Sequence, residues 1–85
     1  MGKAHVIVYS RPGCHLCDEA KAAIESAECG ELFTLEIVSI EGNLELLAKY
    51  RDDIPVVTIN GVEAFKHRVD QHQFKKRILA TDSHG

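Results

Sequence analysis

The sequence lacks the features that would place it in a membrane, in a secretory pathway or on nucleic acid. None of its apolar stretches approaches the roughly 20 residues that a helix needs to cross a bilayer. Its N-terminus runs into the first strand without the apolar region of a signal peptide. The net charge is −3, and the only basic block is residues 75–77 (KKR), which is too little positive charge for nucleic-acid binding. We therefore expect a cytoplasmic protein that binds neither membranes nor nucleic acid.

The sequence contains few cysteines, and their number is odd. The three cysteines are Cys14, Cys17 and Cys29, and an odd count argues against a secreted disulfide scaffold and agrees with a reducing compartment. In such a compartment, two cysteines separated by two residues are typical of catalysis or metal binding rather than of a structural bridge. We expect Cys29 to be a small residue at a helix end without a redox role.

Disorder, repeats, linkers and low-complexity segments are also missing. The chain has 85 residues, of which 45% are hydrophobic and 27% charged, the composition of an ordinary globular domain. This length suffices for one domain with its own core. We expect a single domain over residues 1–85, with residues 80–85 as a frayed tail. The sequence shows no large exposed apolar patch, so a monomer is expected.

Hydrophobic periodicity predicts an α/β domain. Residues 5–9 are apolar without alternation, as in a central strand, whereas residues 32–40 alternate in their centre, as in an edge strand. A hairpin is predicted from residues 54–59 and 62–65, because Asn60-Gly61 supplies the positive φ angles of a tight turn. Right-handed crossover makes the first two strands parallel. The result is a four-stranded mixed sheet in the order 2-1-3-4, with helices on both faces.

Three amphipathic stretches predict the helices. The first starts at the paired cysteines and ends at Cys29-Gly30. The second follows a turn at residues 41–43, and the third has Asp70 as its N-cap. The expected inward positions are Leu44, Leu47 and Ala48 in the second helix, and Phe74 and Ile78 in the third.

The chain is organised around residues 11–17 (RPGCHLC), where the first strand passes through a loop into the first helix. Unpaired N–H groups and the positive end of the helix dipole favour a thiolate on Cys14. We expect Cys14 to be the more exposed thiol and Cys17 the shielded one. A thiolate attacks a disulfide, and a neighbouring thiol then releases the product. The intervening His15 and Leu16 can tune this chemistry.

A pair of cysteines at this spacing is also half of a zinc site. The position between a buried strand and an amphipathic helix favours the redox interpretation over that alternative. A metal-binding module would add a histidine to Cys14 and Cys17, and a redox-inactive interaction domain is a third hypothesis. Four further histidines show no ligand-like spacing, namely His5, His67, His72 and His84.

These features resemble the thioredoxin-fold superfamily, and specifically small glutaredoxin-like proteins, over nearly the whole chain. The matches are the cysteine pair after the first strand, Ile54-Pro55 before the hairpin, and the compact element order. The resemblance implies a thioredoxin-like (glutaredoxin-type) fold and thiol–disulfide oxidoreductase activity. It assigns Cys14 as the nucleophile and Cys17 as the resolving thiol. It also implies a cis peptide bond before Pro55, with the backbone of Ile54 pairing with an extended substrate.

Further residues enter through the same resemblance. Arg11 occupies the place of a basic residue that contacts a glutathione carboxylate in glutaredoxins. Residues 15–16 (HL) stand in place of the usual Pro-Tyr, and Asp53 in place of the usual threonine. Residues 67–70 (HRVD) replace the double glycine that receives the γ-glutamyl end of glutathione, so Arg68 would meet a carboxylate by charge instead.

The resemblance also sets the expected cofactors and partners. We expect no bound cofactor and glutathione as a co-substrate. The substrate would be a disulfide-containing protein or a glutathione mixed disulfide, and glutathione or a reductase would supply electrons. Some glutaredoxin relatives instead share an iron–sulfur cluster between two chains through the first cysteine and glutathione. Their usual Cys-Gly-Phe-Ser motif is missing from this sequence.

Overall fold

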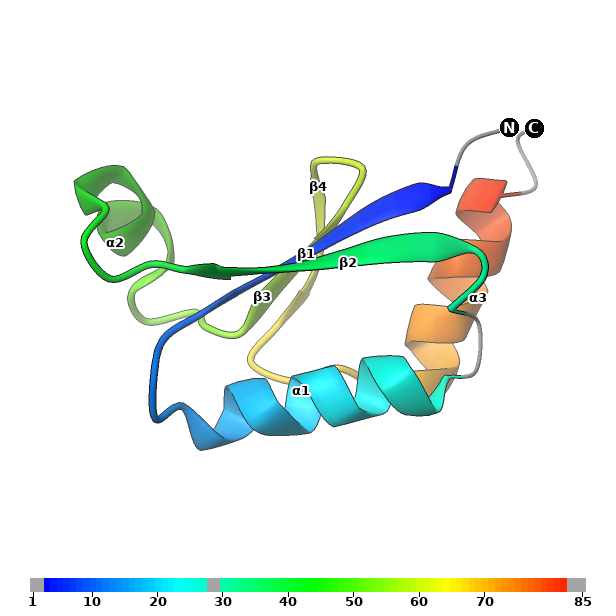
Figure 1. Cartoon of the computed structure of the whole chain (residues 1–85), viewed down its shortest axis with the longest axis horizontal. Helices are drawn as coiled ribbons and strands as arrows, with labels where there is room; N and C mark the ends of the chain where they lie inside the picture. The colour runs from blue at the N-terminus through cyan, green and yellow to red at the C-terminus, as the bar shows by residue number, and fades with distance from the viewer. Residues whose placement is uncertain (1–2, 28–29, 83–85) are drawn as a thin grey trace.

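A computed structural model of the chain describes residues 3–27 and 30–82, and these form seven elements in the predicted order (Figure 1). The elements are β1 (Ala4–Ser10), α1 (His15–Ser26), β2 (Phe33–Ser39), α2 (Leu44–Tyr50), β3 (Val56–Ile59), β4 (Val62–Lys66) and α3 (Gln71–Asp82). Within the described ranges, none of the helices is long and apolar enough to cross a membrane.

The four strands form one mixed sheet in the order β2-β1-β3-β4, as predicted. β1 pairs in parallel with β2 and antiparallel with β3, and β3 pairs antiparallel with β4. The ladder between β3 and β4 shifts register between Val57 and Thr58. β1 is central because its Val6 and Val8 are completely buried, whereas most of β2 is exposed at the edge.

The core lies on both faces of the sheet. In the first cluster, Val57 packs with Ile24 of α1 and with Phe74 of α3, and Figure 1 shows both helices on the same side of the sheet. The neighbouring Val56 belongs to a second cluster with Tyr50 of α2. Because successive residues of a strand point to opposite faces, α2 packs on the other face. This confirms the predicted arrangement of helices.

The predicted inward face of α2 is confirmed for Leu47 and wrong for Leu44 and Ala48. Leu44 is 84% exposed and Ala48 is also exposed, while Leu46 and Leu47 are partly buried and Tyr50 is buried. The helix has only seven residues, and Leu46, Leu47 and Tyr50 make its contact with the core. The N-cap is as expected, since Asn43 Oδ1 accepts the N–H of Leu46 at 3.1 Å.

The ends of α1 and α3 also differ from the expected positions. α1 ends at Ser26, because the N–H of Ala27 bonds the carbonyl of Ile24 and tightens the last turn. Cys29, expected near this helix end, lies outside the described residues.

The start of α3 is as predicted. Asp70 Oδ1 accepts the N–H of Gln73 at 3.0 Å, which confirms the predicted N-cap. α3 continues through Asp82 into the segment expected to be a frayed tail, and residues 83–85 are also outside the described residues.

Replacing Asn60 by alanine is expected to destabilise the protein by about 1–2 kcal/mol. Asn60 has φ 52° in the hairpin turn, and its Oδ1 accepts the N–H of His5 at 2.8 Å. Alanine loses this hydrogen bond and also resists the left-handed backbone. Glycine loses only the hydrogen bond, so Asn60→Gly should cost about 1 kcal/mol less. Urea unfolding of the two variants measures the difference, and equal losses would contradict the backbone contribution.

Candidate active site

The loop between β1 and α1 presents the first cysteine. Gly13 has φ +77°, a conformation that side-chain-bearing residues rarely adopt, and it turns the chain toward the helix. The Cys14 N–H donates to the carbonyl of Arg11 at 3.3 Å. Cys14 is the N-cap residue of α1, with extended backbone at φ −83° and ψ 109°. Its sulfur therefore lies at the helix N-terminus, as predicted.

Cys14 and Cys17 form a disulfide, with their Cα atoms 5.2 Å apart. The two cysteines differ in accessibility, because Cys14 is half-buried whereas Cys17 is only 2% exposed. The N–H of Cys17 donates to the Sγ of Cys14 at 3.2 Å. A hydrogen-bond donor aimed at the sulfur favours its anionic form. The pair thus combines one accessible sulfur with one sulfur held behind it.

Ile54 and Pro55 lie next to this pair. Their peptide bond is cis, as the resemblance implies, and both residues are buried, Ile54 in the same cluster as Cys17. The N–H of His67 donates to the carbonyl of Pro55 at 2.8 Å and to that of Asp53 at 3.3 Å. The backbone N–H and carbonyl of Ile54 have no hydrogen bond within the described residues.

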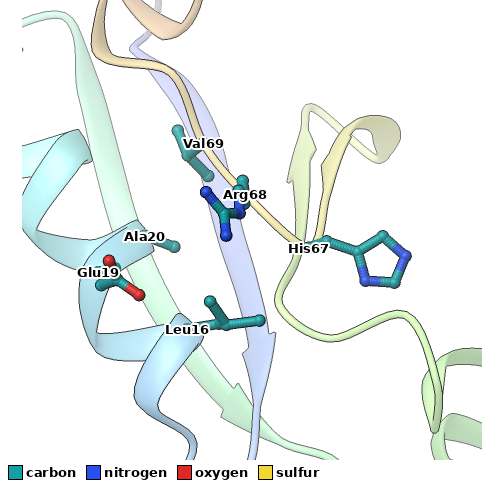
Figure 2. A pocket seen from close by; sticks show the side chains of 6 residues that line it. All are labelled: Leu16, Glu19, Ala20, His67, Arg68 and Val69. Atoms are coloured by element: carbon teal, nitrogen blue, oxygen red, sulfur yellow. The ribbon is translucent and has the colours of Figure 1, made fainter.

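The two predicted basic residues occupy different places. Arg68 lines a pocket between α1 and the segment that joins β4 to α3, and Leu16, from between the two cysteines, lines the same pocket (Figure 2). Arg11 is exposed on the loop before Cys14 and is not among the lining residues of that pocket. The structure therefore brings Arg68 close to the cysteine motif through Leu16.

A cluster of polar side chains beside Ile54-Pro55 was not predicted. The Asp53 carboxylate lies 3.8 Å from both His67 Nε2 and Lys66 Nζ. His67 has φ +67°, so it adopts backbone that glycine adopts more readily. His67 stands where glutaredoxins have their double glycine. This departure from the glutaredoxin pattern was the feature of the sequence that could have pointed to the cluster. The cluster links the loop before β3 to the end of β4.

Glu19 is a second residue that sequence reasoning missed. It lines the same pocket as Arg68. Glu19 follows Leu16 by three positions, and residues three apart lie on one face of a helix. This spacing could have predicted that Glu19 lies beside Leu16 at the pocket. Its carboxylate also lies 3.7 Å from His15 Nε2, in a pair whose side chains are 62% and 88% exposed. Such an exposed pair contributes little to stability.

The metal-site alternative lacks a complete ligand set in the described part of the chain. Across residues 3–27 and 30–82, no group of three or more histidine, cysteine or acidic side chains could hold a metal ion. Cys14 and Cys17 are thus without a third ligand there. Two sulfurs within bonding reach, one of them accessible, suit a reversible two-electron exchange with another disulfide.

Comparisons with known proteins agree with this geometry. Residues 5–79 match the sequence pattern of the glutaredoxin-like domain (DUF836) family. A glutaredoxin-like protein of Dictyostelium discoideum is 38% identical over 69 residues. That match covers 74% of this chain but 64% of the relative, so the chain spans less than two thirds of the relative's length.

Solved structures share the fold. Protein Ne2328 of Nitrosomonas europaea has a TM-score of 0.77 at 29% identity, over 91% of this chain and 93% of that one. A chloroplastic thioredoxin z has a TM-score of 0.73 over 98% of this chain and 80% of that one. Its identity of 13% limits that likeness to the fold alone. The expected thioredoxin-like fold is confirmed.

Proposed function

The chain belongs to the glutaredoxin-like (DUF836) family, and from that membership we propose that it is a thiol–disulfide oxidoreductase that reduces disulfides with Cys14 and Cys17. The observation that carries the proposal is the arrangement of the two sulfurs. A half-buried Cys14 sits at the helix N-cap and accepts a hydrogen bond from the Cys17 N–H, with the buried Cys17 sulfur in bonding reach. An accessible nucleophile backed by a shielded thiol is what sequential exchange requires.

The proposed reaction has two steps. In the reduced protein, the Cys14 thiolate attacks one sulfur of the substrate disulfide, and the other sulfur leaves as a thiolate and takes a proton. Cys17 then gives up its proton and attacks the Cys14 sulfur, which breaks the mixed disulfide and releases the second substrate thiol. Two electrons pass to the substrate, and the protein is left with the Cys14–Cys17 disulfide. A thiol reductant, either glutathione or a reductase, restores the dithiol.

The substrate site in this proposal is made of four residues. The unpaired backbone of Ile54, beside Pro55, would add hydrogen bonds to an extended chain, as an edge strand does. Arg11 and Arg68 would supply positive charge to a carboxylate of glutathione or of a protein substrate. Proteins and glutathione mixed disulfides are both candidate substrates. The proposal assigns the reaction to a monomer in the reducing cytoplasm.

Replacing Cys17 by serine is expected to trap the mixed disulfide on Cys14, because no thiol remains to attack it. The variant is prepared with Cys29→Ser, so that Cys14 is the only thiol left. It is then incubated with glutathione disulfide or with insulin, and the adduct is identified by mass spectrometry. A glutathione adduct supports the glutathione route, and an insulin-chain adduct supports direct reduction of protein disulfides.

The matched control keeps Cys17 as the only thiol, through Cys14→Ser with Cys29→Ser. This control should form little adduct, because Cys17 is 2% exposed. The proposed roles would be overturned if Cys17 formed the adduct and Cys14 did not, or if neither cysteine reacted.

A further inference from the structure

The side of β2 that faces away from β1 carries backbone groups without hydrogen-bond partners. Ala4 lies opposite Phe33 and donates its N–H to the carbonyl of Leu32. Because alternate residues of a strand direct their backbone groups to the same neighbour, the even-numbered residues of β2 bond β1. The N–H and C=O groups of Leu35 and Ile37 therefore point outward. β2 ends the sheet order, so these groups meet no other strand in the described ranges.

The strand β2 lacks the features by which native edge strands avoid pairing with another chain. Those features include lysine, proline and a bulge. β4, the other edge strand, contains Lys66 and pairs with β3 through a register shift. β2 contains neither lysine nor proline, and its seven residues pair with β1 in an unbroken register. A regular, unprotected edge of this kind is a template for another β-strand.

Two apolar side chains are exposed along the same edge. Leu35 is 38% exposed and Ile37 is 43% exposed. Both lie on the face of Phe33, which packs in the first core cluster. On the opposite face of β2, the Glu36 carboxylate lies 3.1 Å from His5 Nε2. The edge thus offers backbone hydrogen bonds, an apolar face and one acidic side chain at its centre.

We infer that this edge is the docking surface for a second copy of this chain, whose β2 pairs with it in the antiparallel direction. Leu35 lies on the twofold axis and faces its own copy, while Phe33 faces the Ile37 of the second copy. The outward groups of these three residues exchange about six hydrogen bonds. Apolar side chains meet on one face of the joined sheet, and the Thr34 hydroxyl lies opposite the Glu36 carboxylate on the other.

Charge selects this register over the alternative that is centred on Glu36. In that alternative the two copies of Glu36 would lie directly opposite each other, and Glu31 would lie opposite Glu41. Like charges directly opposite each other destabilise strand pairing. Centring the pair on Leu35 separates these acidic residues. The chain itself therefore supplies a strand that fits the edge in hydrogen bonding, apolar contact and charge.

The inference goes beyond the proposed function and does not depend on it. Cys14, Cys17 and Ile54 lie outside β2, so each copy keeps its own cysteine pair and substrate backbone. Two short strands bury less surface than the roughly 1,600 Å² of a typical stable interface. We therefore expect a dissociation constant on the order of 100 µM, so that the monomer predicted from the sequence prevails in dilute solution.

Sedimentation velocity of the full chain should show the dimer forming between about 10 µM and about 1 mM, with excess reductant to prevent disulfides between chains. Leu35→Lys should weaken association at least about tenfold, because two ammonium groups would face each other and the apolar contact would be lost. Val62→Lys is the matched control, since Val62 is 61% exposed on the other edge strand. It should leave the dissociation constant within about twofold.

Mixing two variants tests the register. Leu35→Lys and Leu35→Glu should each stay monomeric where the wild type pairs. An equimolar mixture of the two should recover pairing, because each introduced charge then faces the opposite charge. Recovery requires position 35 to face its own copy. If the mixture stayed monomeric with both variants folded, the proposed pairing would be wrong.

Amide hydrogen exchange locates the contact within the strand. As the protein concentration rises, the outward N–H groups of Leu35 and Ile37 should become protected from exchange. The N–H groups of Thr34 and Glu36 already bond β1, so their exchange should not change. The inference would be overturned by a wild type that stays monomeric throughout, by a dimer that survives Leu35→Lys, or by protection that appears elsewhere but not at Leu35 and Ile37.

Discussion

Replacing Cys14 by serine is expected to lower the rate of disulfide reduction at least about 1,000-fold. The serine hydroxyl is not ionised near neutral pH, so the hydrogen bond from the Cys17 N–H would have no anion to stabilise. The buried Cys17 thiol cannot take over the attack. The measurement is the steady-state reduction of hydroxyethyl disulfide or insulin, with a thiol reductant in excess.

Two comparisons make this result specific. Cys29→Ser should keep the wild-type rate within about twofold, because that cysteine is expected to have no redox role. Circular dichroism of the reduced proteins should show the same fold for Cys14→Ser and for the wild type. A Cys14→Ser protein that still reduced either substrate at a comparable rate would show that another thiol starts the exchange, and the assignment of the nucleophile would be lost.

Replacing Phe74 by alanine is expected to reduce the free energy of unfolding by about 3–5 kcal/mol. Phe74 is completely buried, and its ring lies 5.2 Å from that of Phe33 and 6.3 Å from that of Phe65. Alanine would leave a cavity where α3 packs against the sheet. Because small domains are stable by only about 5–15 kcal/mol, this loss should be evident in urea unfolding of the reduced protein.

The matched control is on the same helix. Leu79 is 47% exposed, so Leu79→Ala should cost less than about 1 kcal/mol. Phe74→Leu keeps most of the buried volume and should cost an intermediate amount, which gives a measurable value even if the alanine variant is largely unfolded. If Phe74→Ala and Leu79→Ala lost the same free energy, the buried ring cluster would not be the main support of α3.

Local patterns were sufficient to predict most of the architecture. The hairpin follows from Asn60-Gly61, whose φ angles are 52° and 85°, because few residue pairs adopt this turn easily. The strand order follows from the contrast between an apolar first strand and an alternating second strand, which separates a central position from an edge position. The N-caps at Asn43 and Asp70 are likewise local, because the side chain of each accepts the backbone N–H of the residue three positions later.

The face of α2 was not predictable in the same way. Seven residues make about two turns, which is too short for periodicity to define a face. Tyr50 points inward because Tyr9 is there to stack on it, with the ring centroids 4.7 Å apart. That contact joins residues distant in the sequence, so only the folded chain reveals it.

By itself, the sequence determined the element order, the sheet order and the position of the cysteine pair at a helix start, because these depend on short-range preferences of the backbone. The sequence also predicted which sulfur is the more accessible, but only the tertiary structure decided what surrounds the pair. Burial of Cys17, the unpaired backbone of Ile54, and the shared pocket of Glu19 and Arg68 all require separate segments to meet. Packing, rather than local preference, therefore sets the chemistry available at the site.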